Sequence, residues 1–172
     1  DVRSGVFMEL LLETEIAFTL GQRIDRRIRN VAELKPYVRY THTAFDIGDY
    51  RFVTEGPKGA VQDMVASGVG AHRFVLGPAM DPNQVDVDAV SLKLLRNGES
   101  IRESPATEVL GSPWNSLLWL VNDVVKRGRA LEPGTVVVTG TAAKAYRAKG
   151  DAMKGVYEGD CGGLGKVRLT VK

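Results

Sequence analysis

Two glutamates and an aspartate, Glu13, Glu15 and Asp46, are the residues whose types and settings are best suited to chemistry. The glutamates lie two apart in an otherwise apolar run, Leu10 to Phe18, which predicts a mostly buried strand. Side chains alternate between the two faces of a strand, so both glutamates point the same way, about 7 Å apart at a rise of ~3.3 Å per residue. Asp46 heads a second short apolar run and is the natural third member of the group.

Like charges on one face of an apolar strand repel each other and resist desolvation unless a cation lies between them. Carboxylate oxygens suit a hard divalent cation such as Mg²⁺ or Mn²⁺ better than they suit zinc. The sequence therefore predicts a metal site formed by Glu13, Glu15 and Asp46. The competing interpretation is structural, because a Glu-x-Glu pattern is also typical of the solvated face of a sheet.

The composition limits the function classes. A length of 172 residues with 44% hydrophobic residues predicts one domain with a core. Charge is nearly balanced at +2, and the basic cluster at residues 22–29 is followed by acids with no interleaved aromatic residues, so no nucleic-acid partner is expected. Cys161 is the only cysteine, which excludes an intramolecular disulfide. Without a signal peptide or an apolar run of ~18 residues, we expect a soluble cytoplasmic protein with no membrane partner.

The elements that must position the acids are mostly strands. We expect strands at Met8–Leu20, Val38–Arg51, His72–Gly77, Val90–Leu95, Glu99–Arg102, Thr135–Thr139 and Leu164–Val171, and short helices at Val31–Lys35 and Ala60–Ala66. The β-branched run ending at Thr139 reads as a central strand. Gly48, inside the second strand, indicates a bulge or a close approach of the backbone to a neighbour.

Turn and cap residues fix several boundaries. The dipeptide Asn97-Gly98 predicts a hairpin. Ser112 as N-cap, Pro113 in the first turn and Gly128 past the end predict the longest helix. Further turns are expected at residues 56–59, 150–151 and 159–160. Many short strands and one long helix predict a mainly β domain with a few helices, of the α+β class.

Several short motifs follow one another in a recognisable order. They are the Glu13/Glu15 pair, Thr43-Ala-Phe-Asp-Ile-Gly-Asp-Tyr-Arg51, Arg73-Phe-Val-Leu-Gly77, Val109-Leu-Gly-Ser-Pro113, Leu131-Glu-Pro-Gly-Thr135, Thr139-Gly-Thr141 and Gly163-Leu-Gly165. From Leu11 to Lys172 the chain thereby resembles the 2-keto-4-pentenoate hydratase and 4-oxalocrotonate decarboxylase family, within the fumarylacetoacetase-like superfamily. The resemblance implies a single domain over residues 1–172, a distorted β-barrel or roll of mixed sheets flanked by helices. The N-terminal segment of the family is absent from these residues, so we expect a shortened chain.

The resemblance also implies a site. Glu13, Glu15 and Asp46 match the three ligands of one Mg²⁺ or Mn²⁺ ion, with Asp46 standing where the hydratases usually have Glu. Among the implied catalytic residues are Asp49 and Arg51, with Asp49 orienting Arg51; an ordinary surface ion pair is the alternative.

The third implied catalytic residue is Thr141, in a strand-end loop that faces substrate in the superfamily. In that loop Thr139 and Gly140 would hold a substrate carboxylate through a hydroxyl and a backbone N–H, unless the segment is a plain β-turn. Arg73 would bind a second substrate carboxylate, unless it is a surface residue at a strand start. His42 and His72 are general-base candidates by residue type alone.

The function implied by the resemblance is a metal-dependent hydratase that acts on a small 2-oxo acid in aromatic-compound catabolism. A decarboxylase of the 4-oxalocrotonate type is the first alternative. A hydrolase cleaving a C–C bond is a further one, although it needs a Glu-His dyad that these residues lack. A non-catalytic partner subunit is the last, because Ala66-Ser67-Gly68 replaces polar residues of the family pattern. A homo-oligomer, or a complex with a related hydratase or decarboxylase, is the expected assembly.

Overall fold

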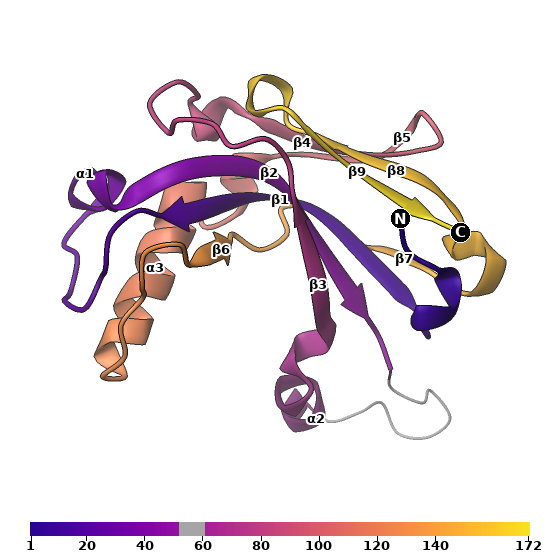
Figure 1. Cartoon of the computed structure of the whole chain (residues 1–172), viewed down its shortest axis with the longest axis horizontal. Helices are drawn as coiled ribbons and strands as arrows, with labels where there is room; N and C mark the ends of the chain where they lie inside the picture. The colour runs from indigo at the N-terminus through magenta and orange to yellow at the C-terminus, as the bar shows by residue number, and fades with distance from the viewer. Residues whose placement is uncertain (52–60) are drawn as a thin grey trace.

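In the computed structural model, which describes residues 1–51 and 61–172, two sheets pack against each other and three helices lie at their ends (Figure 1). One sheet has the strand order β3-β2-β1-β6, with β7 pairing beside β6 on β1, and the other has the order β5-β4-β8-β9. The strand pairs are antiparallel, and the parallel contact is an isolated bridge between Val2 and Val171. The predicted mainly β fold with a few helices is confirmed.

The element bounds lie close to those expected for most of the chain. The strands are β1 Leu10–Leu20, β2 Val38–Asp49, β3 Ala71–Leu76, β4 Ser91–Arg96, β5 Glu99–Pro105, β6 Val136–Val138, β7 Tyr146–Ala148, β8 Gly155–Asp160 and β9 Lys166–Val171, and the helices are α1 Val31–Leu34, α2 Val61–Ala66 and α3 Pro113–Lys126. The turn expected at residues 56–59 and the first residue of the helix expected at 60–66 lie outside the described residues.

The two faces of β1 have different surroundings. Its even-numbered side chains lie in the core, where Leu10 and Leu12 pack with Leu94, Tyr157 and other residues of the second sheet. The odd-numbered side chains, which include both glutamates, are therefore turned away from the second sheet. Burial of the even face fixes the register of β1, since a shift by one residue would expose the whole apolar set.

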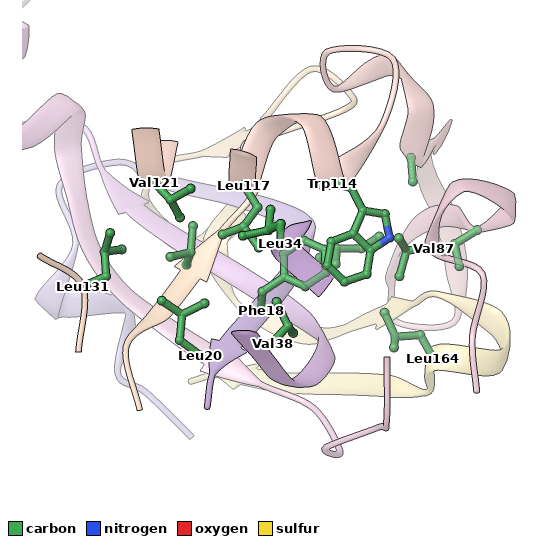
Figure 2. Close-up of a cluster of buried hydrophobic side chains, with 14 of the residues drawn as sticks. Phe18, Leu20, Leu34, Val38, Val87, Trp114, Leu117, Val121, Leu131 and Leu164 are labelled. Atoms are coloured by element: carbon green, nitrogen blue, oxygen red, sulfur yellow. The ribbon is translucent and has the colours of Figure 1, made fainter. Parts of the chain in front are cut away.

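The helix α3 closes one end of this core. The Ser112 hydroxyl accepts the backbone N–H of Trp114 and caps the helix, and Gly128 follows its end with φ +72°, as predicted. Figure 2 shows the apolar side of α3 against the end of β1, where the rings of Trp114 and Phe18 lie 4.5 Å apart between centroids. The same cluster includes Leu117 and Val121 from the helix.

The predicted hairpin and the predicted irregularity at Gly48 are both present. Asn97 and Gly98 have φ of +51° and +88°, and they connect β4 to β5. The β2–β3 register shifts between Ile47 and Gly48. A side chain at position 48 would lie 3.1 Å from Leu11 Cβ and 3.4 Å from the Gly70 carbonyl oxygen, so the strand backbones approach closely there.

Two expectations about the last third of the chain were wrong. The run Thr135–Thr139 was expected as a central strand, yet β6 pairs with β1 alone and lies at the end of its sheet. The predicted turn at Gly159 and Asp160 is part of β8. Position 159 requires glycine for packing and not for a turn. The two sheets meet there, and a Cβ atom would come within 2.9 Å of Phe45 Cε1 and Val167 Cγ1. Among the described residues, no helix combines the length and the apolar character needed to cross a bilayer.

Candidate metal centre

The register of β1 and β2 brings the three predicted acids together. Glu13 pairs directly with Asp46, and Glu15 pairs with Ala44. Directly paired residues share a face of the sheet, so all three carboxylates lie on the face of β1 and β2 turned away from the second sheet. One carboxylate oxygen from each acid lies within 4.8 Å of the other two.

Burial makes the charged form of these acids costly. Burial raises the pKa of Glu15 to about 8, and the charges of Asp46 and Glu13 add to the effect, while a hydrogen bond from the backbone of Gly140 opposes it. Burial and then the charge of Asp46 raise the pKa of Glu13 to about 7, against a hydrogen bond with Thr141. Burial also raises the pKa of Asp46, against a backbone hydrogen bond from Ile47.

The donor set fits a hard divalent cation. The groups that act on these pKa values are other carboxylates, a hydroxyl and backbone N–H groups, and no described positively charged side chain is among them. Three clustered carboxylates without such a partner either hold protons or hold a cation. An all-oxygen set of acids is what Mg²⁺ and Mn²⁺ prefer. The residues present therefore fit the predicted ion.

The loop after β6 positions one of these acids. The backbone N–H of Gly140 donates to Glu15 Oε2 at 2.7 Å. The Thr139 hydroxyl donates to the carbonyl of Ile16 at 3.0 Å, and the Thr139 carbonyl accepts the Ser116 hydroxyl at 2.7 Å. Both groups predicted to hold a substrate carboxylate are thus engaged within the protein, and Gly140 orients a carboxylate of the chain itself.

Thr141 is the predicted catalytic residue that lies beside the acids. It is exposed, and its hydroxyl hydrogen-bonds with Glu13, which lowers the pKa of that carboxyl. The same hydroxyl contacts the carbonyl of Ala143, so its single proton has two acceptors within reach. This arrangement leaves Thr141 at the edge of the site, next to one of the candidate ligands.

Asp49 and Arg51 do not join the acids. Asp49 lies three residues after Asp46, an odd separation, so its side chain points to the opposite face of β2. There its buried carboxylate accepts the backbone N–H groups of Met8 at 2.9 Å and Glu9 at 3.2 Å. Arg51 donates to the other oxygen of this carboxylate at 2.6 Å. The predicted ion pair exists, and it holds the segment before β1.

Arg73 also faces away from the acids. In the β2–β3 ladder Arg73 pairs with Ile47, a core residue, whereas Phe74 pairs with Asp46. Phe74, which the sequence reasoning passed over, is therefore the β3 residue beside the site. Alternation within the strand separates residues 73 and 74, but the pairing register that assigns each to a face is not visible in the sequence.

Neither histidine is among the groups that act on the pKa values of the three acids. His42 is buried, with Nε2 3.0 Å from the Thr19 hydroxyl and Nδ1 3.2 Å from the Gly77 carbonyl. Because a carbonyl only accepts, Nδ1 carries the proton and both ring nitrogens are engaged. His72 is exposed and packs edge-on against Phe7, with 5.6 Å between ring centroids.

Comparison with known proteins gives the same family as the motifs. 2-Keto-4-pentenoate hydratase 1 of Dechloromonas aromatica is 28% identical over 168 residues, which is 96% of this chain and 62% of the relative. The 2-keto-4-pentenoate hydratase of Paraburkholderia xenovorans is 30% identical over 159 residues, 91% of this chain and 57% of the relative. The chain thus spans about three fifths of the length of these relatives.

The fold is also found in a solved enzyme. The structure of 4-oxalocrotonate decarboxylase from Pseudomonas putida G7, complexed with magnesium and adipate, superposes with a TM-score of 0.87 at 22% identity, over 99% of this chain and 64% of the enzyme. A family model for the C-terminal part of fumarylacetoacetate (FAA) hydrolase matches residues 2–172. The chain therefore belongs to the fumarylacetoacetate hydrolase C-terminal family.

Proposed function

We propose that this chain carries the metal-binding face of a hydratase that adds water to a 2-hydroxy-2,4-dienoate, or to its 2-oxo-4-alkenoate form, giving a 4-hydroxy-2-oxo acid in aromatic-compound catabolism. The observation that carries the proposal is the cluster of Glu13, Glu15 and Asp46, whose carboxylate oxygens lie within 4.8 Å of one another. The names of the relatives at 28% and 30% identity support the hydratase reaction.

The three acids would hold Mg²⁺ or Mn²⁺. The chemistry that such a cation supplies is Lewis acidity toward the carboxylate and keto oxygens of a 2-oxo acid, which stabilises negative charge developing on the substrate. The chain contributes the orientation of a ligand, because the Gly140 N–H donates to Oε2 of Glu15 and thereby fixes this carboxylate. Thr141, whose hydroxyl hydrogen-bonds with Glu13, would help to orient that ligand at the edge of the site.

The test is calorimetric titration of the 172-residue chain with Mn²⁺. Glu13→Gln and Glu15→Gln should each weaken binding by more than about 100-fold, since even groups that only orient a ligand are worth ~10–100-fold. Glu103→Gln is the matched control, because Glu103 is an exposed carboxylate on β5 with Lys93 as its partner. Equal isotherms for all four proteins would overturn the metal site and the hydratase proposal with it.

A decarboxylase is the second candidate, and the 0.87 TM-score to 4-oxalocrotonate decarboxylase favours it. A relative named 4-oxalocrotonate decarboxylase, from a Pseudomonas species, is 26% identical over 134 residues. Turnover assays separate the two reactions: a hydratase removes the dienol absorbance without releasing CO₂, and a decarboxylase releases CO₂ from a 2-oxo dioic acid. Binding of Mn²⁺ with neither reaction would instead favour a non-catalytic partner subunit, which associates with a related enzyme.

We also propose that the protein is a homo-oligomer. The support is Trp119, which is 62% exposed on α3, since aromatic side chains are enriched at contact surfaces between proteins. Light scattering should give a mass that is a multiple of 18.7 kDa, and Trp119→Lys should reduce it. A single-chain mass for the wild type would contradict the proposal.

A further inference from the structure

Three side chains form a row across the first sheet. Glu13 on β1 pairs with Asp46 on β2, and Asp46 pairs in turn with Phe74 on β3. Directly paired residues lie on one face with Cβ atoms about 4.5–5.5 Å apart, so Phe74 stands immediately beside Asp46, and Glu13 lies one strand further along the row. This ring is 55% exposed, which leaves an apolar surface open next to the carboxylates.

The adjacent row repeats this pattern. Glu15 pairs with Ala44, and Ala44 pairs with Leu76 on β3. Ala44 itself is fully buried, and Leu76 stands next to Phe74 on the same face, two residues on. On the β3 side of the acids both rows therefore end in apolar side chains.

The nearby positive charges lie elsewhere. Arg73 faces the opposite side of β3, as its pairing with Ile47 requires. Arg147 shares the face of the acids, since it pairs with Leu11, but it lies on β7, on the other side of β1. It donates to Glu9 at 2.6 Å and lies over the ring of Tyr50. The β3 side of the site thus offers no cation among the residues that complete the two rows.

We propose that Phe74, with Leu76 beside it, selects 2-oxo acids whose far end is uncharged. The inference rests on the proposed function, because the acids must first hold a cation to which the 2-oxo acid end binds. The remaining carbon chain then lies over β2 and β3, where covering apolar surface is favourable. A second carboxylate there would lose water next to a phenyl ring without gaining a partner, which is costly. Phe74 thereby favours the alkenoate substrate of a hydratase over the dioic acid of a decarboxylase.

The experiment compares two ligands that differ only at the far end, 2-oxohexanoate and 2-oxohexanedioate, by calorimetry on the Mn²⁺-loaded chain. The wild type should bind 2-oxohexanoate more tightly. Phe74→Ala should weaken 2-oxohexanoate binding about tenfold, the scale of a lost apolar pocket contact, and leave 2-oxohexanedioate nearly unchanged. Phe74→Lys should reverse the order of the two ligands, because it supplies the missing cation.

Arg73→Ala is the matched control, since residue 73 is the neighbour of Phe74 on the opposite face of the same strand. It should leave both affinities unchanged. The inference is overturned, while the proposed function stands, if Arg73→Ala weakens the binding of 2-oxohexanedioate. It is also overturned if the ratio of the affinities for the two ligands is the same in Phe74→Ala and in the wild type. If Phe74→Ala loses Mn²⁺ itself, Phe74 supports the site rather than selecting substrates, which also overturns it. Failure of Mn²⁺-loaded wild type to bind either acid overturns the proposed function first.

Discussion

The backbone N–H of Gly140 donates a 2.7 Å hydrogen bond to Oε2 of Glu15, and this contact joins the loop after β6 to the middle of β1. It is made possible by the unusual backbone of Gly140, whose φ is +91°. The hydrogen bond lowers the pKa of a carboxyl that burial raises to about 8. The loop thus stabilises the ionised form of Glu15, which a metal ligand requires, and fixes one of its two oxygens.

Without metal, the free energy of unfolding should fall as the pH rises from about 5 to about 8. The pKa of Glu15 is about 8 in the folded protein and 4.5 ordinarily, so between these values the folded state holds a proton that the unfolded chain has lost. Raising the pH then favours unfolding by up to about 1.4 kcal/mol per pH unit for this carboxyl. Urea denaturation in EDTA at several pH values measures the slope, and Glu15→Gln should reduce it to the part that the raised pKa of Glu13 contributes.

Saturating Mn²⁺ should reverse this dependence. A bound cation holds the carboxylates in their ionised form, so binding strengthens as the pH rises through the raised pKa values of Glu13 and Glu15. A hundredfold excess of Mn²⁺ over its Kd should add about 2.7 kcal/mol to the free energy of unfolding. The Glu15→Gln variant supplies the control, and an equal gain in that variant would mean that the metal binds elsewhere.

Gly140→Ala should weaken Mn²⁺ binding severalfold and destabilise the fold by about 1–2 kcal/mol, because a side chain at positive φ is strained. Relaxing that strain would move the N–H away from Glu15. Gly134→Ala is the matched control, since Gly134 has φ +85° and, like Gly140, has no atom within 4 Å of an added Cβ. The Gly134→Ala variant should lose about as much stability as Gly140→Ala in thermal denaturation, and it should keep the Mn²⁺ affinity of the wild type. Equal Mn²⁺ affinities in the two variants would show that the hydrogen bond does not matter for the site.

Asp49→Ala should lower the free energy of unfolding by roughly 3 kcal/mol and leave the affinity for Mn²⁺ unchanged. The substitution leaves the N–H groups of Met8 and Glu9 without their acceptor and Arg51 without its partner. Asp49→Asn keeps an acceptor oxygen and should lose less. Chemical denaturation gives the free energy of unfolding, and calorimetry gives the affinity for Mn²⁺. A large loss of Mn²⁺ affinity in a folded Asp49→Asn protein would mean that Asp49 contributes to the metal site.

Gly159→Ala should destabilise the protein by about 1–3 kcal/mol, the usual cost of overpacking. The added methyl group would meet Phe45 and Val167 at 2.9 Å and Thr14 at 3.1 Å, between the two sheets. Gly163→Ala should be nearly neutral, because an added Cβ at position 163 has no atom within 4 Å. Thermal melting of the two variants is the measurement, and similar melting temperatures would mean that the sheets can separate at little cost.

Local patterns in the sequence determined where most helices and strands lie, and that the two glutamates share one face of their strand. The two-residue period of a strand places Glu13 and Glu15 on one face whatever the partner strand is. The Asn97-Gly98 turn and the Ser112 cap specify their elements through backbone geometry and one hydrogen bond each. These features depend on residues a few positions apart, so the sequence alone was sufficient for them.

The tertiary structure decided which residues join the acids. Asp46 lies beside Glu13, and Phe74 rather than Arg73 lies beside Asp46, through pairings between residues 33 and 28 positions apart. Gly140 reaches Glu15 across 125 residues. A shift of either register by one residue would exchange the two faces, and the burial of the whole apolar face selects the register. That burial is a property of the assembled core, which is why neither the contact of Gly140 with Glu15 nor the place of Phe74 beside Asp46 was apparent in the motifs that contain them.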